Sequence, residues 1–186
     1  MSVEAFLVST GVVALAEMGD KTQLLALMLA ARYRRPVPIV FGIAVATLAN
    51  HALAAAFGAW IATLVGADAL RWILALSFFA MGAWVLVPDG ASDFSGGSSR
   101  LGVFGTTLLA FFLVEIGDKT QIATVALAAR YAAFTAVVAG TTLGMLIANV
   151  PAVYLGDRLL RRVPLRLLQR VAAGMFAVLG VLALLV

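Results

Sequence analysis

Six apolar stretches constrain this chain more than any other feature of its sequence. They occupy residues 3–31, 37–65, 69–87, 101–129, 134–156 and 167–186. A helix needs about 20 mostly apolar residues to cross the hydrocarbon core of a bilayer. Because 63% of the 186 residues are apolar and only 12% are charged, the sequence leaves little chain for a domain outside the membrane. We therefore predict an integral membrane protein.

The six stretches are predicted to be helices rather than strands. None of them alternates apolar and polar residues, which is the pattern of a membrane β-barrel. Continuous apolarity favours helices, because a helix satisfies its own backbone hydrogen bonds in lipid. The predicted fold class is an all-α membrane protein with six transmembrane helices.

The two halves of the chain are copies of each other. The segment Glu17-Met-Gly-Asp-Lys-Thr-Gln23 returns 98 residues later as Glu115-Ile-Gly-Asp-Lys-Thr-Gln121, and the same displacement carries Gly42 to Gly140. Residues 88–100, rich in Gly and Ser, have the composition of a flexible linker. We predict a first three-helix repeat at 1–87, a linker at 88–100 and a second repeat at 101–186.

Three spans per copy is an odd number, so the second copy should enter the membrane in the opposite sense to the first. This is the inverted-repeat arrangement of many secondary transporters, in which one half rocks against the other around a central site. The predicted topology places only Arg71 and Arg130 on one side of the membrane. Eight arginines fall on the other side: Arg32, Arg34, Arg35, Arg100, Arg158, Arg161, Arg162 and Arg166. The positive-inside rule then places both termini outside and the linker in the cytoplasm.

Four carboxylates lie near the middle of predicted spans. Glu17 and Asp20 fall in the first span, and Glu115 and Asp118 fall in the fourth. Each charge costs at least about 2.5–3.5 kcal/mol at the centre of a transmembrane helix. Four carboxylates placed symmetrically in the two copies therefore indicate a functional site or a strong structural role.

Each motif has the groups of a site for a hard cation. Residues three or four apart share a face of a helix, so we predict that Glu17, Asp20 and Lys21 form one polar stripe, as do their counterparts in the second copy. A glycine between the two acids allows close backbone approach or a local break in the helix. Carboxylate, amide and hydroxyl oxygens suit Ca²⁺, Mn²⁺ or Mg²⁺. The candidate ligands or supporting residues are Lys21, Thr22, Gln23, Lys119, Thr120 and Gln121.

A structural role for the acids is the alternative. Each Glu or Asp could pair with the lysine of its own motif and hold the helices together. Four carboxylates and two lysines, however, leave two negative charges in excess. One divalent cation or two protons would neutralise that excess, which favours exchange of the two.

Three further polar residues lie in predicted spans. His51 corresponds to Asn149 at the 98-residue displacement, and Asn50 precedes His51. They could support the metal site or relay protons. They could equally make hydrogen bonds that only pack the helices.

The doubled Glu-x-Gly-Asp-Lys-Thr motif resembles the signature of a family of cation/proton exchangers. That family includes the Golgi transmembrane-protein-165 type, chloroplast relatives and bacterial manganese exporters. The resemblance covers essentially the whole chain and implies transport of Mn²⁺ or Ca²⁺ against protons, with Glu17, Asp20, Glu115 and Asp118 as metal ligands. The small size and the lack of a targeting segment look more like the bacterial members, which implies manganese export across the bacterial inner (plasma) membrane.

Other function classes are disfavoured but stay open. A metal-dependent intramembrane enzyme could use the same carboxylates, but the loops are short and the chain has no cysteine. A cation-coupled exporter of a small organic solute, such as an amino acid, is a third reading. No enzyme activity, cofactor or nucleic-acid partner is expected. The expected partners are the metal ion, protons and the bilayer, and a homo-oligomer is compatible with the sequence.

Overall fold

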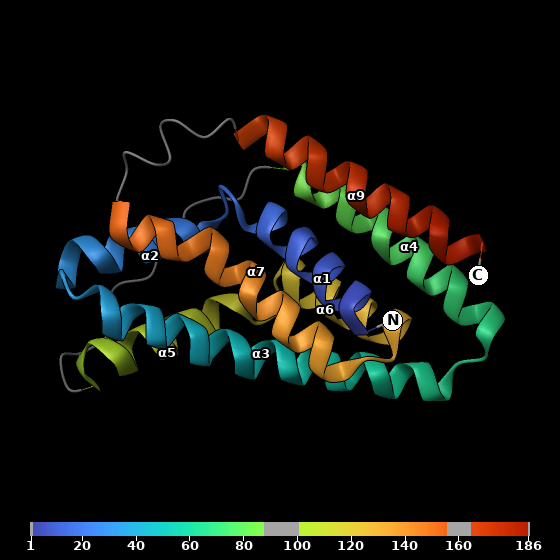
Figure 1. The fold of residues 1–186 in the computed structure, drawn as a ribbon, viewed down its shortest axis with the longest axis horizontal. Helices are drawn as coiled ribbons and strands as arrows, with labels where there is room; N and C mark the ends of the chain where they lie inside the picture. Colours follow the sequence, from blue (N-terminus) through green and yellow to red (C-terminus); the bar gives the residue numbers. More distant parts are fainter. Residues whose placement is uncertain (1, 88–100, 156–164, 186) are drawn as a thin grey trace.

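The computed structural model describes residues 2–87, 101–155 and 165–185 (Figure 1). Every element of these residues is a helix, so the all-α prediction is confirmed for the part of the chain that the structure describes. The predicted linker at 88–100 lies outside it. The helices are α1 (Ser2–Glu17), α2 (Lys21–Tyr33), α3 (Pro36–Leu64), α4 (Ala67–Val85), α5 (Gly102–Glu115), α6 (Lys119–Tyr131), α7 (Phe134–Leu155) and α9 (Leu165–Leu185).

Four helices, α3, α4, α7 and α9, are long and apolar enough to cross a membrane. Helices α1 and α2 form a fifth candidate span if the two are counted together, and they are bent by 71° where they join. Helix α5 is apolar but has only 14 residues. The prediction of a membrane protein is therefore confirmed, and the sixth span stays a prediction.

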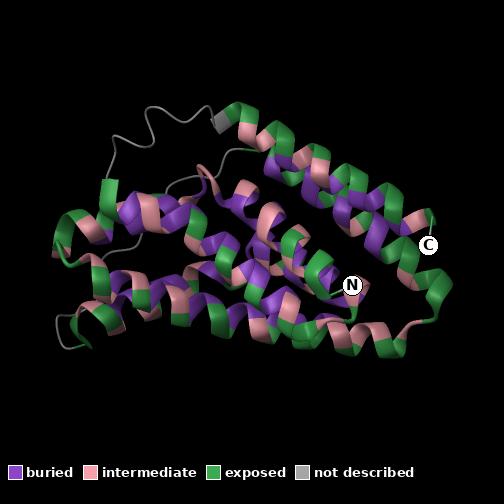
Figure 2. Cartoon of the chain, in the orientation of Figure 1, coloured by how far each residue is buried: buried purple, intermediate pink, exposed green. Residues whose placement is uncertain are grey.

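Large apolar side chains on the outside of the bundle fit contact with lipid. Phe41, Trp60, Leu76 and Val178 are among the exposed residues, with 57–64% of their surface accessible. Figure 2 shows that the buried surface runs along the inward faces of the helices. A bilayer would cover the exposed apolar faces, because burying apolar surface away from water is favourable.

Of the two roles predicted for the glycine between the acids, the structure shows the local break, in both 3–31 and 101–129. Both segments break within the repeated motif, between α1 and α2 and between α5 and α6. The cause is the glycine that separates the acids. Gly19 has a φ of 85° and Gly117 a φ of 78°, in the left-handed region that glycine adopts without steric cost. Each glycine therefore ends one helix and lets the next start in a new direction.

Helices from the two copies of the repeat interlock. Helix α1 packs against α7, and α3 packs against α5, α6 and α7. Two equivalent glycines allow close contact. A Cβ on Gly42 would lie 2.7 Å from Cβ of Thr107 in α5, and a Cβ on Gly140 would lie 2.5 Å from the carbonyl oxygen of Phe6 in α1. This interlocking disfavours the expectation that one half of the chain rocks as a unit against the other.

Helices α4 and α9 form a separate pair along one edge of the bundle (Figure 1). Phe78 of α4 and Phe176 of α9, which correspond at the 98-residue displacement, contact each other with their ring centroids 6.4 Å apart and their planes tilted by 30°. Gly82 lies against Ala173 and Phe176, and Gly180 lies against the ring of Phe79. The pair is thus held together by equivalent contacts from its two members.

The close approach at Gly140 predicts a measurable loss of stability. Gly140→Ala should lower the free energy of unfolding by about 1–3 kcal/mol, the usual cost of overpacking a well-packed site. Gly174→Ala in α9 is the matched control, because a Cβ there would meet nothing within 4 Å. The measurement is denaturant unfolding in mixed micelles. Equal stability of the two variants would contradict the described α1–α7 contact.

Candidate metal site

The two helix breaks face each other inside the bundle and bring four carboxylates together. Glu17 is the last residue of α1, and Asp20 precedes the first residue of α2. Glu115 and Asp118 hold the same positions at the ends of α5 and α6. All four acids are at most 3% exposed. The first and fourth predicted spans therefore meet at a buried cluster of acidic side chains.

The prediction that each motif forms a stripe on one continuous helix face is wrong. Helix α1 ends at Glu17 and α2 begins at Lys21, so these residues belong to different helices. The backbone N–H of Asp20 donates to the carbonyl of Glu17 over 3.0 Å, and the same bond in the second copy measures 3.1 Å. These tight turns bring Glu and Asp of each motif to the break.

Gln23 and Gln121 stabilise the breaks. The side-chain Oε1 of Gln23 accepts a hydrogen bond from the backbone N–H of Gly19 at 3.0 Å, and Gln121 accepts one from Gly117 at 2.7 Å. The Nε2 of Gln23 also donates to the carbonyl of Ala148 in α7 at 2.9 Å. These bonds engage both amide oxygens with the backbone, so we assign the glutamines to positioning the turns.

The lysines form ion pairs across the two motifs rather than within them. Lys21 Nζ lies 2.5 Å from Asp118 Oδ1, and Lys119 Nζ pairs with Asp20 Oδ1. The structural alternative predicted pairs within each motif, whereas these two pairs join one motif to the other. The crossed pairs fasten the break of one copy to the break of the other.

The glutamates have hydroxyl partners on one oxygen only. Thr22 donates to Glu17 Oε2 at 2.6 Å, and Thr120 donates to Glu115 Oε2 at 3.3 Å. Glu17 Oε1, Glu115 Oε1 and Asp118 Oδ2 are buried and accept no hydrogen bond from the described residues. A buried polar atom without a partner is costly, and a cation would remove that cost.

Three of the four acids are close enough to hold one ion. Glu17, Glu115 and Asp118 each offer a carboxylate oxygen, and these three atoms lie within 4.8 Å of one another. All-oxygen carboxylate sites suit hard divalent cations. Asp20 lies beside them through its pair with Lys119.

Asn50 makes a hydrogen bond between two helices, whereas Asn149 makes one within its own helix α7. Asn50 Nδ2 donates to the carbonyl of Phe112, one turn before Glu115, at 3.0 Å. Asn149 Nδ2 donates to the carbonyl of Met145 at 3.1 Å. His51 is fully buried, and its ring nitrogens have no hydrogen-bond partner among the described residues. Its role as a support or a proton relay stays a prediction.

Sequence reasoning missed two parts of this site. It did not find the carbonyl of Ala148 as the acceptor for Gln23. An apolar residue gives no sign that its backbone will be used, so no sequence signal could have found it. It also missed the bond of each glutamine to a glycine N–H. The spacing of four residues between Gly19 and Gln23, repeated in both copies, is the signal that could have found that bond.

Buried polar sites between discontinuous helices are typical of membrane ion transporters. The family model described as "Divalent cation/proton antiporter GDT1" matches residues 5–93 and 103–186. The chain belongs to this family, and it is therefore a membrane transporter of divalent cations. Membership in a transporter family disfavours the reading as an intramembrane enzyme.

A curated relative supports the same assignment. The chain is 51% identical over 181 residues to a protein of Vibrio cholerae serotype O1 (strain ATCC 39541 / Classical Ogawa 395 / O395) described as "Putative manganese exporter". The match covers 97% of this chain and 89% of the relative. No solved structure matches the chain.

The crossed ion pairs predict unequal coupling energies. The Lys119 side chain is 3% exposed and the Lys21 side chain is 24% exposed, so water screens the Lys21–Asp118 pair more. A double-mutant cycle with Lys119→Met and Asp20→Asn should give a coupling energy in the upper part of the usual range of about 0.5–3 kcal/mol. The cycle with Lys21→Met and Asp118→Asn should give a smaller one. Unfolding free energies in micelles measure both, and zero coupling in either cycle would contradict the crossed pairing.

Proposed function

We propose that this protein exports a divalent cation, Mn²⁺ in first place and Ca²⁺ in second, in exchange for protons. The observation that carries the proposal is the buried cluster of Glu17, Glu115 and Asp118, each of which offers one carboxylate oxygen within 4.8 Å of the other two. Asp20, which lies beside this cluster, is the fourth proposed ligand of the transported metal ion. Family membership supports a divalent cation, and the name of the Vibrio relative supports manganese.

Charge counting explains the exchange. The crossed pairs balance Asp20 and Asp118 with two lysines, which leaves the two glutamates uncompensated. One divalent cation or two protons restores neutrality. A centre that carries neither would hold net charge in a low-dielectric interior, which is costly. The protein should therefore change conformation only when loaded with metal or with protons, and this condition enforces exchange instead of leak.

We further propose six spans arranged as two inverted three-helix repeats. In this arrangement α5 and α6 together make the fourth span, as α1 and α2 make the first, which brings the number of spans to six. The equivalent contacts of Gly42 with α5 and of Gly140 with α1 support it. The bias of eight arginines against two supports a cytoplasmic position for the Arg32 side and an outside position for both termini. The protein would lie in the bacterial plasma membrane, where inward proton flow drives metal export.

Substituting the four acids tests the site. Glu17→Gln, Asp20→Asn, Glu115→Gln and Asp118→Asn should each reduce metal transport strongly, because each removes one negative charge from the proposed site and so changes its charge balance. The matched control is Glu4→Gln, which changes an exposed acid at the start of α1. The assay is Mn²⁺ flux into proteoliposomes at equal amounts of protein, with no organic solute present. Near-normal transport in any two of the four variants would overturn the shared site.

The coupling prediction concerns voltage and protons. Exchange of one divalent cation for about two protons moves no net charge. Metal flux should therefore depend weakly on an imposed membrane potential and should be matched by an opposing pH change. Metal affinity should fall as the pH is lowered, since protons and the metal compete for the same carboxylates. Fluorescent pH and metal probes in liposomes measure this, and strongly voltage-dependent flux would refute the two-proton scheme.

A further inference from the structure

The two ends of the bundle are built from equivalent segments of the two repeats. At one end, here called the Arg32 end, α2 ends and α3 and α5 begin. At the other, the Arg130 end, α6 ends and α4 and α7 begin. Perfect repeat symmetry would give both ends the same packing.

The α4/α9 pair breaks this symmetry. At the Arg130 end, α4 packs against α6 and α1 packs against α9. The repeat-equivalent contacts would join α9 to α2 and α4 to α5. These two pairings have no comparable packing in the part of the chain that the structure describes. The α4/α9 pair therefore lies against the Arg130 end and away from the Arg32 end.

Residue burial shows the same asymmetry at equivalent positions. Ala126 and Ala129 of α6 are 4% and 8% exposed. Their counterparts in α2 are Met28, which is 46% exposed, and Ala31, which is also exposed. The lysines of the site follow this pattern, since Lys21 at the start of α2 is more exposed than Lys119 at the start of α6.

Close glycine contacts divide the described helices into two bodies. Gly42, Gly58, Gly140 and Gly144 make backbone-level contacts within the group formed by α1, α3, α5, α6 and α7. Within the α4/α9 pair, Gly82 lies against the backbone of Ala173 and Gly180 lies against the ring of Phe79. Between the two bodies, the glycine contact is that of Gly11 with the flexible end of the Met175 side chain at 3.5 Å. An ordinary contact of this kind can be broken and remade at little cost.

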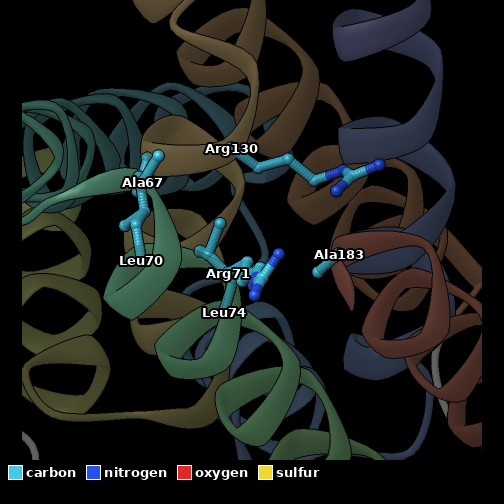
Figure 3. Close-up of a pocket in the computed structure, with 7 residues that line it drawn as sticks. Ala67, Leu70, Arg71, Leu74, Arg130 and Ala183 are labelled. Carbon is cyan, nitrogen blue, oxygen red and sulfur yellow. The ribbon is translucent and has the colours of Figure 1, made fainter. Parts of the chain in front are cut away.

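The interface between the two bodies also contains a cavity. It has a volume of about 170 Å³ and is lined by residues of α4, α6 and α9, among them Leu70, Ala129 and Ala183 (Figure 3). Figure 3 shows the side chains of Arg71 and Arg130 at this cavity, from α4 and α6. This pocket is open to the outside, whereas other residues of α4 and α9 pack with residues of α1 and α6 in one buried cluster.

We propose that the α4/α9 pair is the gate of the transporter. It moves as a rigid body and closes the acidic site at the Arg130 end in the conformation described here. In the opposite conformation it packs on α2 and α5 and closes the Arg32 end. The inference rests on the proposed function and identifies the part of the protein that moves. The helices α1, α2, α3, α5, α6 and α7 hold the metal site. The position of the α4/α9 pair determines from which side of the membrane a metal ion reaches that site.

Two alanines that correspond in the repeat give a matched test. Ala31→Cys and Ala129→Cys place one thiol each in a chain that has no cysteine. A membrane-impermeant maleimide should label position 31 at least about tenfold faster than position 129. The reason is that position 129 is accessible only in the minor conformation, which is typically 0.1–10% populated. Label reaching position 31 from the cytoplasmic side supports the proposed orientation. Equal labelling of the two positions would overturn the asymmetric gate.

Double-cysteine variants test the movement itself. Leu70→Cys with Ala129→Cys joins α4 to α6 across the cavity, and the repeat-equivalent pair is Leu168→Cys with Ala31→Cys. A short thiol crosslinker should join the first pair in the resting protein and the second pair only during metal and proton exchange. Each crosslink should abolish Mn²⁺ flux. A cleavable crosslinker should restore the flux after reduction, and the single-cysteine variants serve as controls.

The outcomes separate this inference from the proposed function. If the parent protein moves no Mn²⁺ in liposomes, the proposed function fails, whatever the crosslinks show. If the parent transports but the Leu168 and Ala31 pair never crosslinks, the α4/α9 gate is overturned. The gate is also overturned if either crosslink forms and leaves transport at the level of the parent.

Discussion

The crossed ion pairs between the two motifs are the interaction on which the rest of the structure depends. Lys21 pairs with Asp118, and Lys119 pairs with Asp20, so each half of the chain neutralises an acid of the other. Buried charges are tolerated when they are paired and hydrogen-bonded. The crossing also leaves the two glutamates without a cationic partner from the opposite motif, so the same interaction that joins the halves defines the charge that a cation must supply.

The helix breaks connect this electrostatic arrangement to the backbone. Gly19 and Gly117 turn the chain, and Gln23 and Gln121 take up the N–H groups that the turns would otherwise leave unpaired. In lipid an unpaired N–H costs several kcal/mol, roughly as much as a buried charge on the insertion scale. The glutamines therefore remove the cost of an unpaired N–H at each break. The two breaks in turn bring carboxylates from four helix ends close together.

The packing of the helices differs between those that carry the site and the α4/α9 pair. Glycine contacts tie the site-bearing helices to one another, whereas α4 and α9 are tied mainly to each other. In the proposed gate, tight packing would keep the geometry of the site while the α4/α9 pair moves. The described structure has this pair packed against α6 and α1, and the proposal adds a second position against α2 and α5.

The sequence by itself determined the membrane class, the helical fold and the four acids, because apolarity and a repeated charged motif are local properties that need no knowledge of packing. It also pointed to Gly19 and Gly117 as sites of a break, without deciding between a break and a continuous helix. Only the tertiary structure decided that Lys21 reaches Asp118 rather than Asp20, and that Ala129 is covered while its counterpart Ala31 is exposed. The physical reason is that two copies of one motif have the same local preferences, and contacts between distant helices alone can make equivalent residues different.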